Sequence, residues 1–158
     1  MDKKPVTNID VSYNVAMITL GNLPDDINLI SEIFEVLSDE GINIDMVSKP
    51  APLKGTVSMS FTLPTDDMVK AITLLNDYKK KKKGNFLVEV DAYNSKISVY
   101  GEEMKYTPGV ATRVFKVLAR EKIDVKVITT SAVDISCLIF ERNIDDAVNS
   151  IKKEFSLE

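Results

Sequence analysis

The residues best placed to do chemistry lie at positions 103–111, just before a predicted helix in the second half of the chain. Pro108 fixes the approach of the backbone, and Gly109 lets it turn closely into the helix. A helix start offers free N–H groups and the positive end of a dipole, which suit a carboxylate. A nearby carboxylate or carbonyl can receive an ammonium. The stretch therefore suits the two charged groups of a free amino acid, although a plain tight turn has the same pattern.

Acidic residues offer a second kind of chemistry. Five aspartates could serve acid–base catalysis or bind a metal, namely Asp25, Asp26, Asp45, Asp66 and Asp67. None of their spacings requires such a role, and Asp66 and Asp67 are better placed to stabilise the start of a helix. We therefore expect neither a catalytic residue nor a metal site in this chain.

The residue types that are missing exclude several function classes. The 158 residues include no His, no Trp and one cysteine, Cys137, and the formal net charge is −4. Ser-His-Asp triads, Cys-His nucleophiles, zinc fingers and intramolecular disulfides are thereby excluded. A lone thiol suits a reducing compartment, which predicts a cytoplasmic location. No apolar run approaches the roughly 20 residues that span a bilayer, so no membrane partner is expected.

Five consecutive lysines occupy residues 79–83. They could bind nucleic acid, or they could form the solvated end of a helix, where the dipole favours cations and Gly84 stops the helix. The rest of the chain is net acidic, and no aromatic residues interleave with the lysines to stack on bases. The nucleotide-binding glycine patterns are also absent. We favour the helix end and expect no nucleic-acid partner.

Apolar residues recur with strand-like and helical spacing in the order β-α-β-β-α-β through the first half. The predicted strands are at residues 15–20, 42–46, 57–63 and 86–90, and the predicted helices are at 29–37 and 68–75. Gly21 is expected to end the first strand, Gly41 to end the first helix and Thr65 to cap the second.

The second half repeats this order but is one strand short. Its predicted strands are at residues 97–99, 123–127 and 133–139, and its predicted helices start after Gly109 and at Ile144. Thr7, Ile9 and Val11 alternate ahead of the first repeat and have no place within it. We infer that this N-terminal segment crosses over and completes the second sheet.

An internal repeat agrees with this organisation. Residues 31–49 align with 112–130 at an offset of 81, and five of the 19 positions are identical. The element order is that of the ferredoxin-like sandwich, an α+β fold. We predict two such βαββαβ domains, residues 13–93 and residues 6–12 plus 94–158, interlocked by the N-terminal strand.

Motifs in both halves resemble one known family. The second half carries Met104-x-x-x-Pro108-Gly109-Val110-Ala111, Ile123-Asp124-Val125 and Ile128-Thr129-Thr130-Ser131-x-x-x-Ile135-Ser136, and the first half carries Leu23-Pro24-Asp25, Ile33-Phe34 and Gly41-Ile42-Asn43-Ile44-Asp45-Met46-Val47. These motifs resemble the tandem ACT domains of the regulatory region of aspartokinase, from about Val6 to Phe155. In that family too, the strand ahead of the first ACT domain joins the second.

The resemblance implies feedback regulation of aspartate kinase by lysine or threonine, in a homodimer of paired ACT domains. The family's kinase domain, which would hold ATP and magnesium, lies N-terminal to this region, so no cofactor is expected in this chain. The chain could be a separate small subunit or part of a longer one. Acidic residues in the first loop favour lysine. The alternatives are a stand-alone ACT-type module for another ligand, an RNA-binding sheet, or an enzyme in its own right.

The resemblance also implies two effector sites. The first would use Asp25, Asp26, Asn28, Leu29, Ile30 and Lys49, with Asp124 and Val125 facing it from a partner subunit. The second would use Met104, Thr107, Gly109, Val110 and Ala111, with Asn43, Ile44 and Asp45 opposite, while Thr130 and Ser131 match the family's effector-sensitive strand end.

The first site departs from the family pattern at two positions. Asn28 stands where the family favours glycine, and asparagine tolerates the positive φ of the expected turn. Lys49 stands where many relatives carry glutamine. A cation there disfavours a bound ammonium unless Asp25 or Asp45 pairs with it.

Overall fold

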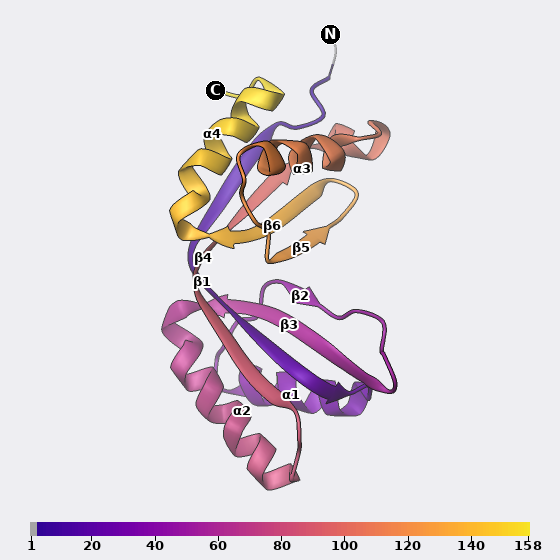
Figure 1. The fold of residues 1–158 in the computed structure, drawn as a ribbon, viewed down its shortest axis with the longest axis vertical. Helices are drawn as coiled ribbons and strands as arrows, with labels where there is room; N and C mark the ends of the chain where they lie inside the picture. The colour runs from indigo at the N-terminus through magenta and orange to yellow at the C-terminus, as the bar shows by residue number, and fades with distance from the viewer. Residues whose placement is uncertain (1–2) are drawn as a thin grey trace. The chain divides into compact units, whose positions relative to one another are not determined.

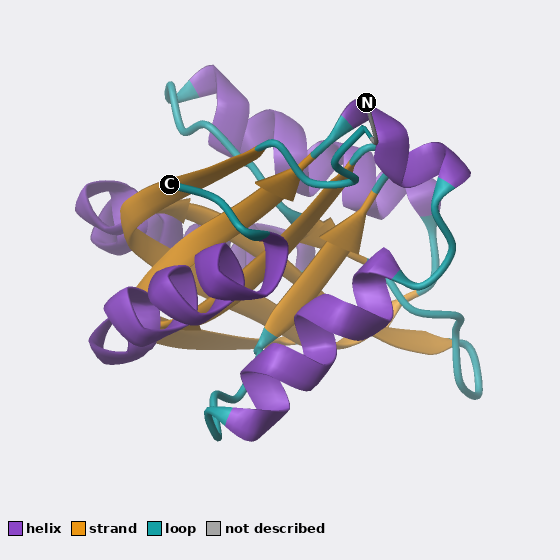
Figure 2. Cartoon of the chain, turned by 90° about the horizontal axis from the view of Figure 1, so that it is seen from above, coloured by secondary structure: helices purple, strands orange, loops and turns teal. Residues whose placement is uncertain are grey.

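The structure is a computed structural model that describes residues 3–158 (Figure 1). Figure 2 marks its helices and strands by colour. In chain order the elements, with η for a short 3-10 helix, are β1 (Asn8–Pro24), α1 (Ile27–Asp39), β2 (Val47–Ser48), β3 (Thr56–Pro64), η1 (Thr65–Asp67), α2 (Met68–Lys82), β4 (Leu87–Tyr100), η2 (Glu102–Tyr106), α3 (Val110–Arg120), β5 (Val127–Thr130), β6 (Asp134–Phe140), η3 (Glu141–Asn143) and α4 (Ile144–Phe155). Within residues 3–158, none of the helices combines the length and apolar character needed to cross a membrane.

Asn14–Tyr93 forms one of two compact units. Its strands are hydrogen-bonded in the order β2-β3-β1-β4, and α1 and α2 lie on one side of them (Figure 1). Ile33 of α1 and Leu75 of α2 are fully buried in a core with Phe61 of β3. Antiparallel strands with both helices on one face make the ferredoxin-like sandwich that the sequence predicts.

The second unit combines the described residues up to Tyr13 with Asn94–Glu158. Its strand order is β1-β4-β6-β5, so the N-terminal part of β1 takes the place of the missing fourth strand. The amide of Thr7 donates to the carbonyl of Tyr100 at 2.8 Å, and Val6 is fully buried in the core under α3 and α4. The predicted fold, with its crossing N-terminal strand, is confirmed. The sequence places the domain boundary before residue 13, whereas the structure divides the chain after it.

β1 and β4 are longer than the sequence predicts because each is one strand that contributes to both units. Separate strands at 86–90 and 97–99 are therefore a wrong prediction. Asn14 in β1 and Tyr93 in β4 have left-handed φ values of 55° and 62°. Each marks the point where the buried side chains change from one alternation phase to the other, so the pattern breaks although the strand does not.

Gly21 does not end its strand, contrary to prediction. β1 continues to Pro24 through an irregularity in its pairing with β3 between Leu20 and Leu23. Asn22 takes a left-handed φ of 54° in this bulge. A glycine inside a strand pattern thus indicates a bulge here rather than a stop.

Residues 42–46 and 123–126 lie outside the strands, so the strand predictions for these residues are wrong. The observed strands begin after them, β2 at Val47 and β5 at Val127. The apolar residues alternate because Ile42 and Met46 are buried. Their amides nevertheless make irregular bonds: that of Ile42 closes the end of α1, and that of Met46 donates to a side-chain hydroxyl at 2.9 Å.

Helix ends agree with the sequence only in part. Gly41, at φ 76°, ends α1 as predicted. Thr65 does not cap α2, because η1 intervenes and its buried hydroxyl has no hydrogen-bond partner within the described part of the chain. Lys83, at φ 50°, takes the left-handed position at the end of α2 that the sequence assigns to Gly84.

Polar contacts join the two helices of each unit. The hydroxyl of Tyr78 donates to Glu32 at 2.6 Å, and the Nε of Arg113 donates to Glu154 at 2.9 Å. Glu32 and Arg113 are equivalent under the repeat offset of 81. Burial, together with the bond to Glu32, raises the pKa of Tyr78 to about 12, so this phenol remains a donor throughout the neutral range.

Gly101 lets the N-terminal segment approach the end of β4. A Cβ at this position would lie 1.9 Å from the carbonyl oxygen of Pro5. The contacted atom is backbone, so it cannot turn aside as a side chain would. Gly101 is therefore required for docking the segment that leads into β1.

We expect Gly101→Ala to destabilise the protein by about 1–3 kcal/mol, the usual cost of overpacking. Gly21→Ala is the matched control, because its Cβ would meet Leu87 at an ordinary 3.7 Å. Urea denaturation of both variants measures the difference. Equal midpoints for the two would contradict the assigned role of Gly101.

Candidate functional site

A pocket of about 260 Å³ opens at the start of α3, beside the end of β5. Residues from the loop before α3, its first turn and the β5–β6 turn line it: Met104, Thr107, Gly109, Val110, Ala111, Thr130, Ser131, Ala132 and Ile135. The structure thus brings together the residues predicted for the loop and helix start of the second site and for the effector-sensitive strand end. Asn43, Ile44 and Asp45, predicted to lie opposite, do not line this pocket.

The first turn of α3 provides the pocket with backbone donors. Gly109 precedes the helix at φ 87°, and among the described residues no side chain caps this end. The first intrahelical bond runs from the amide of Arg113 to the carbonyl of Gly109, at 3.0 Å. The amides of residues 110–112 precede it and lack intrahelical acceptors, so they can bind an anion.

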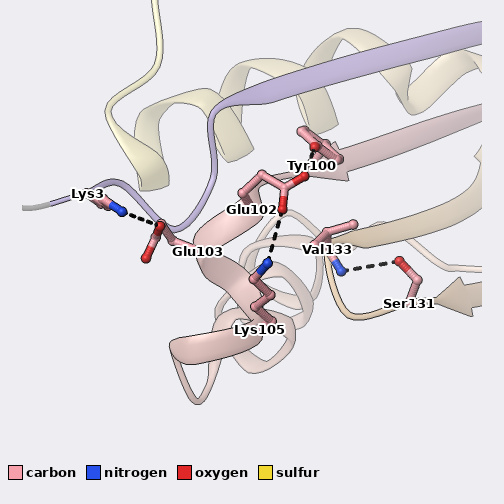
Figure 3. Close-up of polar contacts among 7 residues, drawn as sticks. All are labelled: Lys3, Tyr100, Glu102, Glu103, Lys105, Ser131 and Val133. Atoms are coloured by element: carbon pink, nitrogen blue, oxygen red, sulfur yellow. Dashed lines mark hydrogen bonds and ion pairs between the residues drawn. The ribbon is translucent and has the colours of Figure 1, made fainter.

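Polar contacts hold the loop that precedes this helix (Figure 3). Glu102 in η2 accepts a hydrogen bond from the hydroxyl of Tyr100 and lies 3.4 Å from the ammonium of Lys105. The bond from Tyr100, and then Lys105, lower the pKa of Glu102. The same bond raises the pKa of Tyr100. The carboxylate and phenol therefore keep these roles at neutral pH.

Hydroxyl groups form the polar part of the pocket. That of Thr107 donates to the carbonyl of Glu103 at 2.8 Å, and Lys3 pairs with the Glu103 carboxylate at 3.1 Å. The hydroxyl of Ser131 accepts from the amide of Val133 at 3.2 Å (Figure 3), which leaves its proton able to reach a ligand. The lining residues that the structure describes include no carboxylate.

Two lining residues, Ala132 and Ile135, are absent from the predicted site. Ala132 directly follows the predicted residue Ser131 in the turn, and this adjacency is the signal by which the sequence could have identified it. Ile135 is buried at the start of β6, and its apolar alternation marks it only as core.

The first predicted site has a different helix start. Asp26 is extended, at φ −133°, and its carboxylate accepts from the amide of Asn28 at 2.9 Å. Helix α1 consequently begins at Ile27, two residues earlier than α3 does under the repeat offset. Asn28 lies within the helix, so the predicted positive-φ turn at this position is wrong.

Lys49 is paired in the first site. Its ammonium lies 2.9 Å from the carboxylate of Asp25, with about a third of each side chain exposed. The amide of Asp25 in turn donates to the carbonyl of Gly55 at 3.1 Å. The sequence predicts that a cation at Lys49 disfavours a bound ammonium unless Asp25 or Asp45 pairs with it, and Asp25 is the residue that pairs.

The residues still to be placed are Leu29 and Ile30 of the first site and the two segments predicted to face the sites from a partner subunit, Asn43, Ile44 and Asp45 for the second site and Asp124 and Val125 for the first. Ile30 is buried in the core, and Leu29 packs against it. Asn43, Ile44 and Asp45 lie before β2, and Asp124 and Val125 lie in the corresponding segment before β5. Their predicted contact with a partner subunit stays a prediction.

Cys137 is unsuited to nucleophilic chemistry in the folded protein. It is buried in β6, and this burial, with a smaller effect of Asp134, raises the pKa of its thiol to about 11. The thiolate is the reactive form, and it is scarce at neutral pH.

Comparison with known proteins gives these features a context. The sequence profile of the ACT domain family matches residues 19–78 and 97–155, one match in each repeat. Aspartokinase of Bacillus sp. (strain MGA3) is 30% identical over 156 residues, which cover 96% of this chain and 37% of that protein. The chain thus spans less than two fifths of the length of this curated relative.

Solved structures give a closer match in length. One chain of a crystal structure of aspartokinase alpha and beta subunits is 30% identical, with a TM-score of 0.86, and the match covers 96% of this chain and 99% of that one. The ligand-free regulatory subunit of aspartate kinase from Thermus thermophilus is 25% identical, with a TM-score of 0.87 and the same coverage.

The two helix starts should differ in how much an alanine substitution destabilises the protein. We expect Gly109→Ala to lower stability by about 1–2 kcal/mol, because alanine disfavours the left-handed conformation. Asn28→Ala, at the equivalent position but inside α1, should change stability by less than about 0.5 kcal/mol. Urea denaturation tests the pair, and an Asn28→Ala cost as large as that of Gly109→Ala would refute the assigned difference.

Proposed function

Because this chain belongs to the ACT domain family, as a tandem-ACT regulatory region of the aspartokinase type, we propose that it senses a free amino acid, lysine or threonine, and restrains an aspartate kinase when that amino acid accumulates. The observation that carries the proposal is the pocket at the start of α3. Uncapped amides, hydroxyls and a short apolar wall converge there on a volume suited to a small ligand.

The α-carboxylate of the amino acid binds at the amides of the first turn of α3. These donors lie at the positive end of the helix dipole and have no side-chain competitor among the described residues. Gly109 precedes these amides, and the space beside it is open, since a Cβ there would meet nothing within 4 Å. Its positive φ, rather than lack of space, is what favours glycine.

The side chain of the amino acid lies between the hydroxyls and the apolar residues of the pocket. Thr107, Thr130 and Ser131 can exchange hydrogen bonds with a hydroxyl, and Met104 and Ile135 can cover a methyl group. These groups favour threonine over lysine. The acidic residues that favour lysine from the sequence are used elsewhere, since Asp25 pairs with Lys49 and Asp26 caps α1.

A second copy of the chain completes the site in this proposal. The ammonium of an amino acid needs a carbonyl or carboxylate, and the described lining of this pocket contains no carboxylate. Asn43, Ile44 and Asp45 of a paired ACT domain would supply those oxygens. Binding would then be coupled to the pairing of two chains.

The regulated partner is the catalytic domain or subunit of an aspartate kinase, which would bind ATP and magnesium in the cytoplasm. A ligand that prefers one arrangement of the paired ACT domains shifts the population toward it. If the kinase is inactive in that arrangement, the coupling free energy between the two sites appears as feedback inhibition.

Calorimetric titration of the purified chain with L-threonine and with L-lysine tests this proposal. We expect threonine to bind more tightly than lysine, because the pocket offers hydroxyl partners and no carboxylate. Tighter lysine binding would reverse the assignment of the effector. Silence from both amino acids, at concentrations where the chain is dimeric, would refute the proposed function.

A charge placed in the first turn of α3 locates the site. We expect Ala111→Asp to weaken effector binding by more than tenfold, because its carboxylate takes the amides and repels the ligand, while an acidic residue suits this end of a helix. Lys116→Asp is the control, since the exposed Lys116 belongs to the same helix but lies beyond its first turn and does not line the pocket. An equal effect of both variants in the titration would argue against this location.

A further inference from the structure

We propose that the first of the two repeat-related sites is filled by the chain's own side chains: Asp26 takes the place of the carboxylate of an amino acid, and Lys49 takes the place of its side chain. The protein therefore binds one effector per chain, at the start of α3. This inference rests on the proposed function, because it takes the pocket at α3 as the working form of the site.

The carboxylate position is filled at the start of α1. The side chain of Asp26 accepts from the amide of Asn28 at 2.9 Å, so an internal carboxylate binds the first turn of the helix. At the equivalent place in the second repeat, Thr107 turns its hydroxyl to the carbonyl of Glu103 instead. No side chain among the described residues caps α3. The same helix end is self-capped in one repeat and open in the other.

The side-chain position is filled from the strand side. Lys49 directly follows β2, and the repeat offset of 81 pairs it with Thr130, which lines the pocket beside α3. The Lys49 ammonium lies 2.9 Å from Asp25, in the loop that leads into α1. Where the second repeat leaves a cavity between loop and strand, the first has a charged pair between them.

The backbone at the first site is also in a conformation that leaves less room. Asn28 lies in α1 because Asp26 starts the helix two residues early, whereas its counterpart Gly109 remains outside α3 with a left-handed φ. The asparagine side chain stands where glycine presents none. The cap occupies one amide of the first turn, and the ion pair and the early helix start take space that a ligand needs.

The consequence is that the two repeats have different roles. In the unit Asn14–Tyr93, the ion pair of Asp25 and Lys49 joins the loop to the strand, and it does so at every effector concentration. Only the unit containing α3 responds to the effector. An exposed ion pair alone contributes little stability, so its role here is to occupy the site.

The number of effector molecules bound per chain tests this inference. Calorimetry of the unaltered chain should give one. The triple variant Asp26→Thr, Asn28→Gly and Lys49→Thr, which installs the second repeat's residues in the first site, should give two. Lys70→Thr is the control for loss of a lysine in this unit, since it removes exposed contacts with the carboxylate and the carbonyl of Glu40 at the far end of α1, and it should still give one.

The outcomes separate this inference from the proposed function. Two molecules bound by the unaltered chain, or one bound by a folded triple variant, overturn the self-filled site and leave the proposed function standing. No binding by the unaltered chain overturns both. Ala111→Asp supplies a measurement that does not depend on folding of the triple variant: it should leave no strong binding, and residual binding of one effector with unchanged affinity overturns the inference.

Discussion

The completion of the second sheet by the N-terminal strand is the constraint on which the rest of the structure depends. The edge of β4 in the second unit would otherwise present unpaired backbone groups, and Val6, Ile9 and Val11 would have no core to enter. Because the strand that pairs there continues into the other unit, β1 and β4 must each change their alternation phase once, at Asn14 and at Tyr93. The duplicated fold is therefore two sandwiches that share strands in the chain, and the unit containing α3 is complete only when the chain's beginning has docked beside Gly101.

Within this frame, a small difference at the start of one helix separates the two repeats. The side chain of Asp26 can reach the first turn of its helix, whereas Gly109 has no side chain to do so. The internal cap starts α1 two residues early and uses a donor, and the absence of a cap leaves the donors of α3 for a ligand. An intramolecular carboxylate is always present at high effective concentration, so it prevails over a free one. Duplication supplied two equivalent helix starts, and in our proposal the local capping residue decides which of them remains able to bind.

The regulatory proposal depends on parts of the structure that are held firmly and on one part that is open. The helices of each unit are joined by Tyr78 with Glu32 or by Arg113 with Glu154, and the loop before α3 is held by Tyr100, Glu102 and Lys105. The polar groups that remain available converge on the pocket between α3 and β5. A ligand there meets prepared partners, so little of its binding free energy is lost in ordering the protein. More of it can then bias the pairing of subunits on which the proposed feedback depends.

The sequence by itself determined the order of elements, the duplication, the crossing strand and the residues around Gly109, because burial alternation and the special conformation of glycine are local properties that the chain carries in any context. Only the tertiary structure decided where strands end. The alternation at residues 42–46 comes from burial, and backbone bonds to β3 are made only near its end, by Asp45 and Met46. The breaks at Gly21 and between residues 90 and 97 are changes of phase within continuous strands. It also decided the fate of the first site. The family motif predicts a turn at Asn28, whereas the local cap of Asp26 starts the helix there, and the pairing of Lys49 with Asp25 requires atoms that lie close only after folding. Hydrogen bonds and ion pairs depend on distances of about 3 Å between side chains, and the spacing of residues along a chain does not specify such distances.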